Sequence, residues 1–198
     1  RKNYVSFFVD FETVMDLDEN STQCNINMTF MIGCIAVVNG KSSYKDFTVS
    51  RLTDIEEKKI FIRWIEYMNR ISNKHNALLK DVPIYHWSPA EKTFYKAAAN
   101  KHLLEPIDSF KWIDMFQIFK REPITLKNAW AFGLKNIAKV LYDNGEIKTT
   151  WSVDDATDGQ DAMVRVIKCN EKADIKNVPL KRFEEMHQII TYNYVDCQ

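Results

Sequence analysis

Two acids near the start of the chain, Asp10 and Glu12, stand two residues apart directly after an apolar stretch at 5–9. Side chains at positions i and i+2 of a β-strand point to the same face, so both carboxylates are expected side by side at the end of a strand. Buried like charges are costly unless a metal ion or another partner compensates them. The pair therefore predicts a site for a divalent cation.

Two further acids fall where an α/β fold would return them to this strand end. Glu91 lies in the first turn of a predicted helix after a short strand at 83–87, and ligands of open α/β sheets bind at that end of a strand. Asp196 lies on the last predicted helix, four residues after Tyr192, so both side chains project from one helical face.

The four acids would form one carboxylate cluster, consisting of Asp10, Glu12, Glu91 and Asp196. Two hard cations, Mg²⁺ or Mn²⁺, about 3.5–4 Å apart would suit it, one on each side of a phosphate as in two-metal hydrolysis. One ion would lower the pKa of a water that attacks phosphorus, and the other would stabilise the leaving 3′ oxygen. The Tyr192 hydroxyl is the candidate to orient that water. Each acid alone also has a simpler explanation, such as a favourable contact between Glu91 and a helix dipole.

The elements around these acids begin with three predicted strands, at 4–9, 29–38 and 44–49. Asn39-Gly40 is a turn signal between the last two, and the short connections favour an antiparallel meander. The polar segment 16–27 is predicted to be a loop beside the acidic pair.

Helical periodicity runs from 54 to 71, with Thr53 or Asp54 as the candidate N-cap and one apolar stripe along its length. After the strand at 83–87, Ser88 is predicted to cap a helix that has Pro89 at its first position. This order of strands and helices indicates that parallel strands join the meander. The remaining predicted elements are a short strand or turn with a helix within 110–119 and helices at 134–141, 159–169 and 180–197.

The composition is that of one folded domain: 198 residues, 45% of them hydrophobic, with 5 Gly and 5 Pro. The 27 basic and 27 acidic residues cancel, so nucleic acid would have to be bound through local patches or metal bridges rather than a bulk basic field. The cysteines form no C-x-x-C pair, which argues against structural zinc and favours reduced thiols at Cys24, Cys34, Cys169 and Cys197.

Targeting signals are not recognisable in the sequence. No apolar run approaches the roughly 20 residues of a membrane span, and no segment resembles a signal peptide, so we expect a soluble intracellular protein of undefined compartment. The chain starts without Met and stops inside a predicted helix. We therefore expect a single domain, 1–198, excerpted from a longer polypeptide.

Three segments resemble, in order, the three exonuclease motifs of the DEDD superfamily: Phe-Val-Asp-Phe-Glu-Thr at 8–13, Tyr-His-Trp-Ser-Pro-Ala-Glu-Lys at 85–92 and Tyr-Asn-Tyr-Val-Asp-Cys at 192–197. The third has the Tyr-x-x-x-Asp form of the tyrosine subclass, which contains the proofreading domains of DNA polymerases. The closer likeness is to RNase H-like domains found beside RecB-type nucleases or helicases. Further segments resemble blocks of that subgroup, at 112–115, 133–138, 150–151 and 158–163.

The resemblance implies an RNase H-like α/β fold, in which a mixed sheet of three antiparallel strands plus parallel strands is flanked by helices. It also implies a 3′-5′ exonuclease with two Mg²⁺ or Mn²⁺ ions, acting on single-stranded 3′ ends of DNA rather than RNA, beside a helicase or nuclease domain of the same polypeptide. In that case Tyr192 positions water, and the metal ligands are Asp10, Glu12, Glu91 and Asp196. The second motif usually carries Asp, whereas this chain has Glu91.

Three alternatives stay open at the level of sequence. An endonuclease of the wider RNase H-like group is disfavoured by the Tyr-x-x-x-Asp helix at 192–196. A catalytically silent domain that binds nucleic acid, or packs against a helicase or nuclease partner, is compatible with the neutral charge. An ordinary α/β domain with coincidental acids is disfavoured because the motifs occur in order.

Several neighbouring residues have both a structural and a functional interpretation. His86 is expected to be a core histidine bonded to the backbone rather than a general base, and Trp87 suits either core packing or stacking on a nucleobase. Asp114 is a substitute metal ligand, although a cap or turn role is simpler. A solvated face or phosphate contacts would explain the lysines Lys92, Lys96 and Lys101. Helix capping rather than catalysis is predicted for the acids Asp154, Asp155, Asp158 and Asp161.

Overall fold

The computed structural model describes residues 4–15, 27–122, 124, 126, 129, 131–151 and 159–198. Five strands form one sheet: β1 (Val5–Val14), β2 (Met28–Val38), β3 (Lys41–Thr48), β4 (Pro83–His86) and β5 (Lys111–Asp114). The α-helices in the described part are α1 (Asp54–Lys74), α2 (Ala90–His102), α3 (Met115–Arg121), α4 (Leu134–Asp143), α5 (Gly159–Lys176) and α6 (Glu184–Cys197). Short 3₁₀ turns lie at Leu79–Asp81, Ile107–Ser109 and Leu180–Arg182.

The strand order in the sheet is β3-β2-β1-β4-β5. β1 pairs antiparallel with β2 and β2 antiparallel with β3, whereas β4 is parallel to both β1 and β5. The predicted antiparallel meander with added parallel strands is therefore confirmed, and the topology is that of the RNase H-like fold. β1 lies at the centre of the sheet, which gives the two acids of this strand a rigid support.

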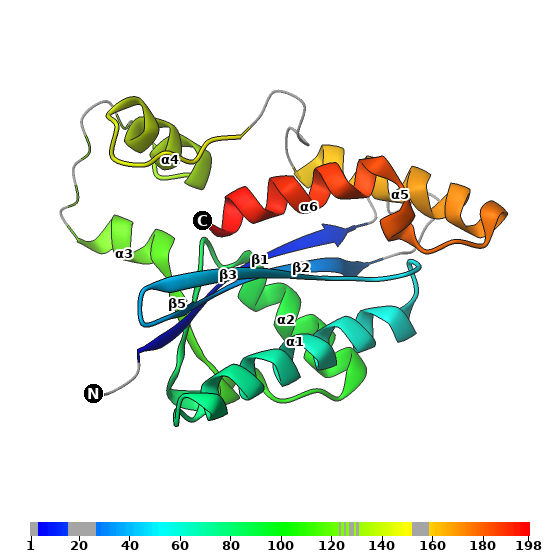
Figure 1. Ribbon diagram of the computed structural model, residues 1–198, viewed down its shortest axis with the longest axis horizontal. Helices are drawn as coiled ribbons and strands as arrows, with labels where there is room; N and C mark the ends of the chain where they lie inside the picture. The colour runs from blue at the N-terminus through cyan, green and yellow to red at the C-terminus, as the bar shows by residue number, and fades with distance from the viewer. Residues whose placement is uncertain are drawn as a thin grey trace.

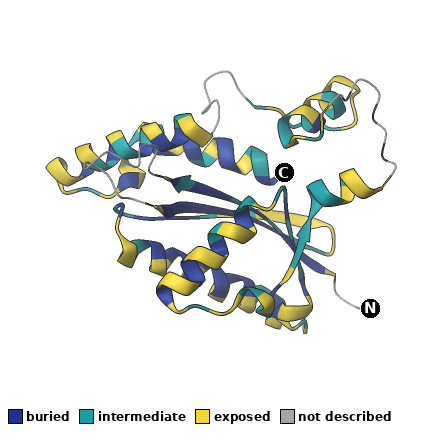
Figure 2. Ribbon diagram, turned by 180° about the vertical axis from the view of Figure 1, so that it is seen from behind, coloured by how far each residue is buried: buried dark blue, intermediate teal, exposed yellow. Residues whose placement is uncertain are grey.

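Helices cover both faces of the sheet (Figure 1). α1 and α2 lie on one face, α5 and α6 lie on the other, and α4 stands beside the C-terminal end of α6. β1 and β2 are mostly buried between these layers, whereas the edge strand β3 is largely exposed and α4 is mostly exposed or half-buried (Figure 2). The sheet thus separates a structural face, under α1 and α2, from the face that carries the acids.

The hydrophobic core on the α1 and α2 face is built from aromatic rings. Phe11 of β1 makes edge contacts with Phe61 and Trp64 of α1, and both α1 rings contact Tyr95 of α2. The apolar stripe predicted for α1 is buried as expected, at Ile60, Phe61, Trp64, Ile65 and Met68. Burial of one such side chain contributes roughly 1.5–3 kcal/mol, so this face holds β1 firmly in place.

Some predicted boundaries were wrong. β1 was expected to end at residue 9 but continues to Val14, because its pairing with β2 goes on past the acids, through a register shift between Glu12 and Thr13, and buries Phe11 and Val14. The last helix was expected over 180–197, but extended backbone at Phe183 separates the turn at Leu180–Arg182 from α6. The predicted loop at 16–27 lies outside the described residues except for Asn27.

The predicted helix starts are mostly confirmed. The Thr53 side chain accepts the N-terminal capping hydrogen bond of α1. α2 begins at Ala90, one residue later than predicted, with Pro89 just before it. The Ser88 hydroxyl nevertheless accepts a hydrogen bond from the Ala90 N–H at 3.3 Å, although Ser88 itself has a positive φ of 91°. This turn places the start of α2 beside the end of β4.

No helix in the described part of the chain is long and apolar enough to cross a membrane. The cysteines that the structure describes, Cys34, Cys169 and Cys197, are free, as expected, and all three are buried. Cys24 lies outside the described residues.

Candidate metal centre

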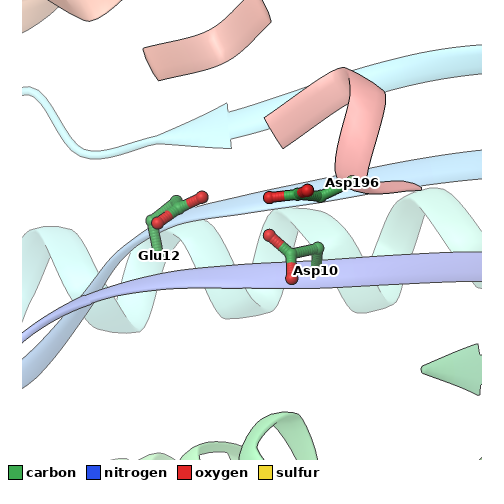
Figure 3. Close-up of side chains that lie close together, drawn as sticks. All are labelled: Asp10, Glu12 and Asp196. Carbon is green, nitrogen blue, oxygen red and sulfur yellow. The ribbon is translucent and has the colours of Figure 1, made fainter. Parts of the chain in front are cut away.

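Three of the predicted ligands lie together on the α6 face of the sheet. Asp10 and Glu12 project from the same face of β1, and Asp196 comes down from the last turn of α6 (Figure 3). One carboxylate oxygen from each lies within 4.8 Å of the others. Three hard oxygen donors at this spacing are suited to Mg²⁺ or Mn²⁺.

Close packing of α6 on β2 brings Asp196 into reach. Asp10 is paired with Gly33 across the β1–β2 ladder, so the two positions share one face of the sheet. A Cβ atom at Gly33 would lie 1.7 Å from Asn193 Oδ1 and 2.9 Å from Cys197 Sγ. Glycine at this position therefore permits the approach of α6.

Asn193 belongs to this candidate site but was not predicted from the sequence. Its side chain is fully buried, and Nδ2 donates to Asp10 Oδ2 at 2.6 Å and to Glu12 Oε1 at 3.3 Å. The amide thus bridges the two acids of β1. A usable signal was present, because Asn193 stands three residues before Asp196 on the same helix and so shares part of its face.

Burial and mutual repulsion raise the pKa values of Asp10, Glu12 and Asp196. The pKa of Asp10 lies well above its ordinary value because of desolvation and then the charges of Glu12, Asp196 and Glu91. Burial, with the charge of Asp196, raises the pKa of Glu12 to about 7. Burial raises the pKa of Asp196 to about 6, although hydrogen bonds from Tyr192 and Trp151 oppose this shift. The metal-free cluster therefore holds negative charge at a cost that a cation would remove.

The side chains around Asp196 come from α6 and the α4 region. Trp151 Nε1 donates to Asp196 Oδ1 at 2.9 Å. Lys135 Nζ lies 4.8 Å from the ring centroid of Tyr192, which is buried, and its positive charge lowers the pKa values of Glu12 and Asp196. Tyr192 is thus beside the acids, as predicted, while Lys135 and Trp151 extend the site.

Glu91, the fourth predicted ligand, stands beside the trio rather than within the 4.8 Å group. Its charge acts on both Asp10 and Asp196. Glu91 is buried, and among the described residues its Oε2 has no hydrogen-bond partner, with His86 Nδ1 at 3.4 Å. A buried carboxylate oxygen without a donor is costly, so a cation between Glu91 and Asp10 would fit here.

His86 and Asp114 have the structural roles that were predicted as the simpler ones. His86 is buried, and its Nδ1 donates to the Ser88 carbonyl oxygen at 2.6 Å. Asp114 Oδ1 accepts from the backbone N–H groups of Ser88 and Gln117, both at 3.2 Å, and so caps α3. Both residues fix the turn from which Glu91 projects.

The structure also gives the positions of the lysines around α2 and of one acid, Asp161, near the start of α5. Lys101 pairs with Asp54 and Glu57 on the opposite face of the sheet, and Lys92 and Lys96 are exposed, in keeping with a solvated face. Asp161 forms an ion pair with Arg165 within α5. The remaining acids of that segment, Asp154, Asp155 and Asp158, lie outside the described residues.

Two of the cavities beside the acids share Asp10 and Asp196. One of about 340 Å³ is lined by Asp10, Asp196, Tyr192, Trp87 and the first turn of α4. A second, of about 230 Å³, shares Asp10, Asp196 and Trp87 but is mostly apolar, with Phe8, Tyr85 and Phe119 among its walls. Trp87 is held by a hydrogen bond to the Phe132 carbonyl at 3.1 Å and packs on Phe119 at 5.1 Å. A charged and an apolar compartment therefore meet at the carboxylates.

No protein-family model matches the chain, and a search of curated proteins gives no significant match. The assignment of a function therefore depends on the geometry of the site and on the order of the motifs.

Proposed function

We propose that this domain is a metal-dependent 3′-5′ exonuclease that hydrolyses phosphodiester bonds of single-stranded DNA. The observation that carries the proposal is the convergence of Asp10, Glu12 and Asp196, whose ligand oxygens lie within 4.8 Å of one another beside an open cavity. Repelling, desolvated carboxylates stabilise a fold poorly, whereas they bind hard divalent cations well.

The donor set fits two divalent cations. Asp10, Glu12 and Asp196 would hold them, and the partnerless oxygen of Glu91 would complete the set on the side of α2. When bound, two such ions supply a water of lowered pKa and charge stabilisation for the leaving oxygen. The extra methylene of Glu91 relative to Asp is compatible with its position beside the trio.

The chain's own residues would bind and orient the substrate. Tyr192 reaches the cavity beside Asp196, where its hydroxyl can orient the attacking water. Lys135 lines the same cavity and offers a positive charge for a phosphate. The apolar compartment around Trp87 offers flat rings to an unpaired terminal base.

The rings that line the apolar compartment favour a substrate whose terminal nucleotide is unpaired. Base stacking in the apolar compartment requires a nucleobase released from its duplex partner. The net charge of zero leaves little long-range attraction for duplex DNA, so contacts at the site itself dominate binding.

The proposal is tested by digestion of 5′-labelled single-stranded DNA with Mn²⁺ or Mg²⁺. We expect the wild type to give a ladder of shortened labelled products that EDTA abolishes and that Asp10→Asn does not give. Asp143→Asn, at an exposed residue paired with Lys139 on α4, is the matched control and should cleave like the wild type.

Two further substrates separate the alternatives. Circular single-stranded DNA should remain intact, since cutting of the circle would indicate an endonuclease. An RNA of the same sequence should be degraded more slowly than the DNA. No cleavage by wild type with either metal would overturn the proposal and favour a silent domain that binds nucleic acid or a partner.

A further inference from the structure

Asn193 makes contacts that go beyond filling space between α6 and the sheet. Its Nδ2 donates to both acids of β1 and to the Asp10 carbonyl oxygen at 3.3 Å. Its Oδ1 accepts from the Tyr44 hydroxyl at 3.1 Å, while Cys197 Sγ lies 3.8 Å away. Both ends of the amide are therefore engaged, one toward the cluster and one toward the edge strand β3.

The Tyr44 hydroxyl acts as a donor in this arrangement. It lies 3.1 Å from Asn193 Oδ1 and 3.4 Å from the Ile190 carbonyl oxygen, and a carbonyl oxygen can only accept. A flipped amide would turn Oδ1 toward two carboxylates and Nδ2 toward a hydroxyl that already points at it. The Tyr44 contact and the carboxylates thus favour the same orientation of the amide.

We infer that Tyr44 and Asn193 form a positioning pair that holds Asp10 and Glu12 in the geometry needed for divalent cations. This inference rests on the metal-dependent function proposed above. Neither residue touches substrate: Tyr44 orients the Asn193 amide, and the amide holds the two carboxylates.

A neutral bridging donor suits this task better than a cation. Two ionised carboxylates on one strand face repel each other and would rotate apart without a donor between them. An amide engages one oxygen of each and leaves the other for a metal ion, because a carboxylate has two acceptor oxygens. It adds no positive charge, so it does not weaken cation binding as a lysine would.

The surroundings keep the pair rigid. The Tyr44 ring packs on Tyr194 of α6, with centroids 4.9 Å apart. Gly33 provides the space in which the Asn193 amide lies, since a Cβ there would meet Oδ1 at 1.7 Å. An edge strand that carries none of the acids therefore contributes to the geometry of the metal centre.

The test is a double-mutant cycle on Mn²⁺ affinity, measured by titration calorimetry on the whole chain. Tyr44→Phe keeps the ring and removes only the hydroxyl, and we expect its Kd for Mn²⁺ to rise about 2- to 10-fold, the effect of one neutral hydrogen bond. Asn193→Ala removes both donations to carboxylates and should raise Kd about 10- to 100-fold. Tyr44→Phe combined with Asn193→Ala should bind like Asn193→Ala alone, because Tyr44 acts through Asn193.

Tyr67→Phe is the matched control. It deletes a hydroxyl that interacts with Ser43 of the same strand β3, and Tyr67 packs on Phe47 on the α1 face, away from the acids. Its Mn²⁺ affinity should equal that of the wild type. Raising the Mn²⁺ concentration should restore the turnover of Tyr44→Phe, with KM for DNA unchanged throughout.

The outcomes distinguish this inference from the function on which it rests. If the wild type binds no Mn²⁺, the proposed function fails and the positioning role fails with it. If the wild type binds Mn²⁺ and Tyr44→Phe binds it equally well, only the positioning role is overturned. The same holds if the effects of Tyr44→Phe and Asn193→Ala simply add. Because Tyr44→Phe is conservative, a failure of Asn193→Ala to fold leaves the Tyr44→Phe result decisive.

Discussion

Replacing Glu12 by Gln should make the metal-free protein more stable at alkaline pH while abolishing its metal site. Glu12 is 5% exposed and stands beside Asp10 and Asp196, so its ionised form is opposed by desolvation and repulsion. Glutamine has nearly the same shape, carries no charge and can still accept from Asn193. The substitution therefore removes the penalty and leaves the packing in place.

The magnitude follows from the pKa of Glu12, which rises from 4.5 to about 7 on folding. At 1.36 kcal/mol per pKa unit, this is a penalty of about 3 kcal/mol once the group is ionised in both states. This shift already includes the stronger hydrogen bond that Asn193 makes to the ionised form, so no separate correction for that bond is needed. A stabilisation of about 3 kcal/mol corresponds to an increase of roughly 6–12 °C in Tm for a domain of this size.

The sign of the pH dependence is fixed by the direction of the shift. Because the folded-state pKa is raised, the unfolded chain loses its proton first as pH rises, and stability falls between about pH 4.5 and 7. Below this window Glu12 is protonated in both states and resembles glutamine. The advantage of Glu12→Gln should thus vanish near pH 4.5 and be complete near pH 8.

The assay is thermal unfolding in EDTA at both pH values, followed by the same measurement with Mn²⁺. Wild type should gain stability from Mn²⁺ above pH 7, whereas Glu12→Gln should gain little, since a ligand stabilises only a state that binds it. Glu185→Gln is the control, because Glu185 pairs with Lys172 and its pKa is lowered, so this change should not stabilise the protein. Equal Tm shifts of Glu12→Gln at the two pH values, or a Tm below wild type near pH 8, would refute the reasoning.

Three other substitutions give separate expectations. Lys135→Met should weaken binding of single-stranded DNA at all sequences and lower the slope of log affinity against log salt by about 0.7–1, if Lys135 contacts one phosphate. Trp151→Phe removes the hydrogen bond of 2.9 Å from Trp151 Nε1 to Asp196 Oδ1. The acidic limb of the pH–rate profile should therefore shift to a pH about one to two units higher, because a hydrogen bond to a charged group stabilises it by that amount. Gly33→Ala should destabilise the protein by about 1–3 kcal/mol or more, because its Cβ would overlap Asn193 Oδ1.

Gly33→Ala has a matched control, and each of the three expectations has a result that would contradict it. Gly159→Ala lies at the start of α5, where no atom of the described residues comes within 4 Å of the added Cβ, and should not destabilise the protein. If Lys135→Met leaves the slope of log affinity against log salt unchanged, Lys135 does not contact a phosphate of the bound DNA. Superimposable pH profiles of Trp151→Phe and wild type would show that the hydrogen bond to Asp196 does not tune its ionisation. A melting curve of Gly33→Ala equal to wild type would mean that α6 can retreat without cost.

Much of the fold could be predicted because the responsible signals are local. Spacing of two in a strand placed Asp10 and Glu12 on one face, and spacing of four in a helix placed Tyr192 with Asp196. The stripe around Trp64 identified α1, and the order of strands and helices gave the mixed sheet. Each of these inferences needs only the periodicity of one element or its place in the chain.

The remaining features depend on contacts between distant segments. Tyr44 and Asn193 meet only because β3, β2 and α6 pack in one register, and no local pattern contains that register. The need for glycine at position 33 is not visible in the strand sequence, because it arises from the contact with α6. The position of Glu91 beside the trio depends on the turn at Ser88, whose positive φ cannot be inferred from a serine followed by a proline.

The most direct test of the metal centre is a crystal grown with Mn²⁺ near pH 8 and measured for the anomalous scattering of manganese. We predict two anomalous peaks about 3.5–4 Å apart, bounded by Asp10, Glu12 and Asp196, with Glu91 turned toward the peak nearer α2. Asn193 should keep its contacts to both acids of β1. Absence of any peak at these carboxylates in the presence of Mn²⁺, with the acids still clustered, would contradict the assignment of this site as a metal centre.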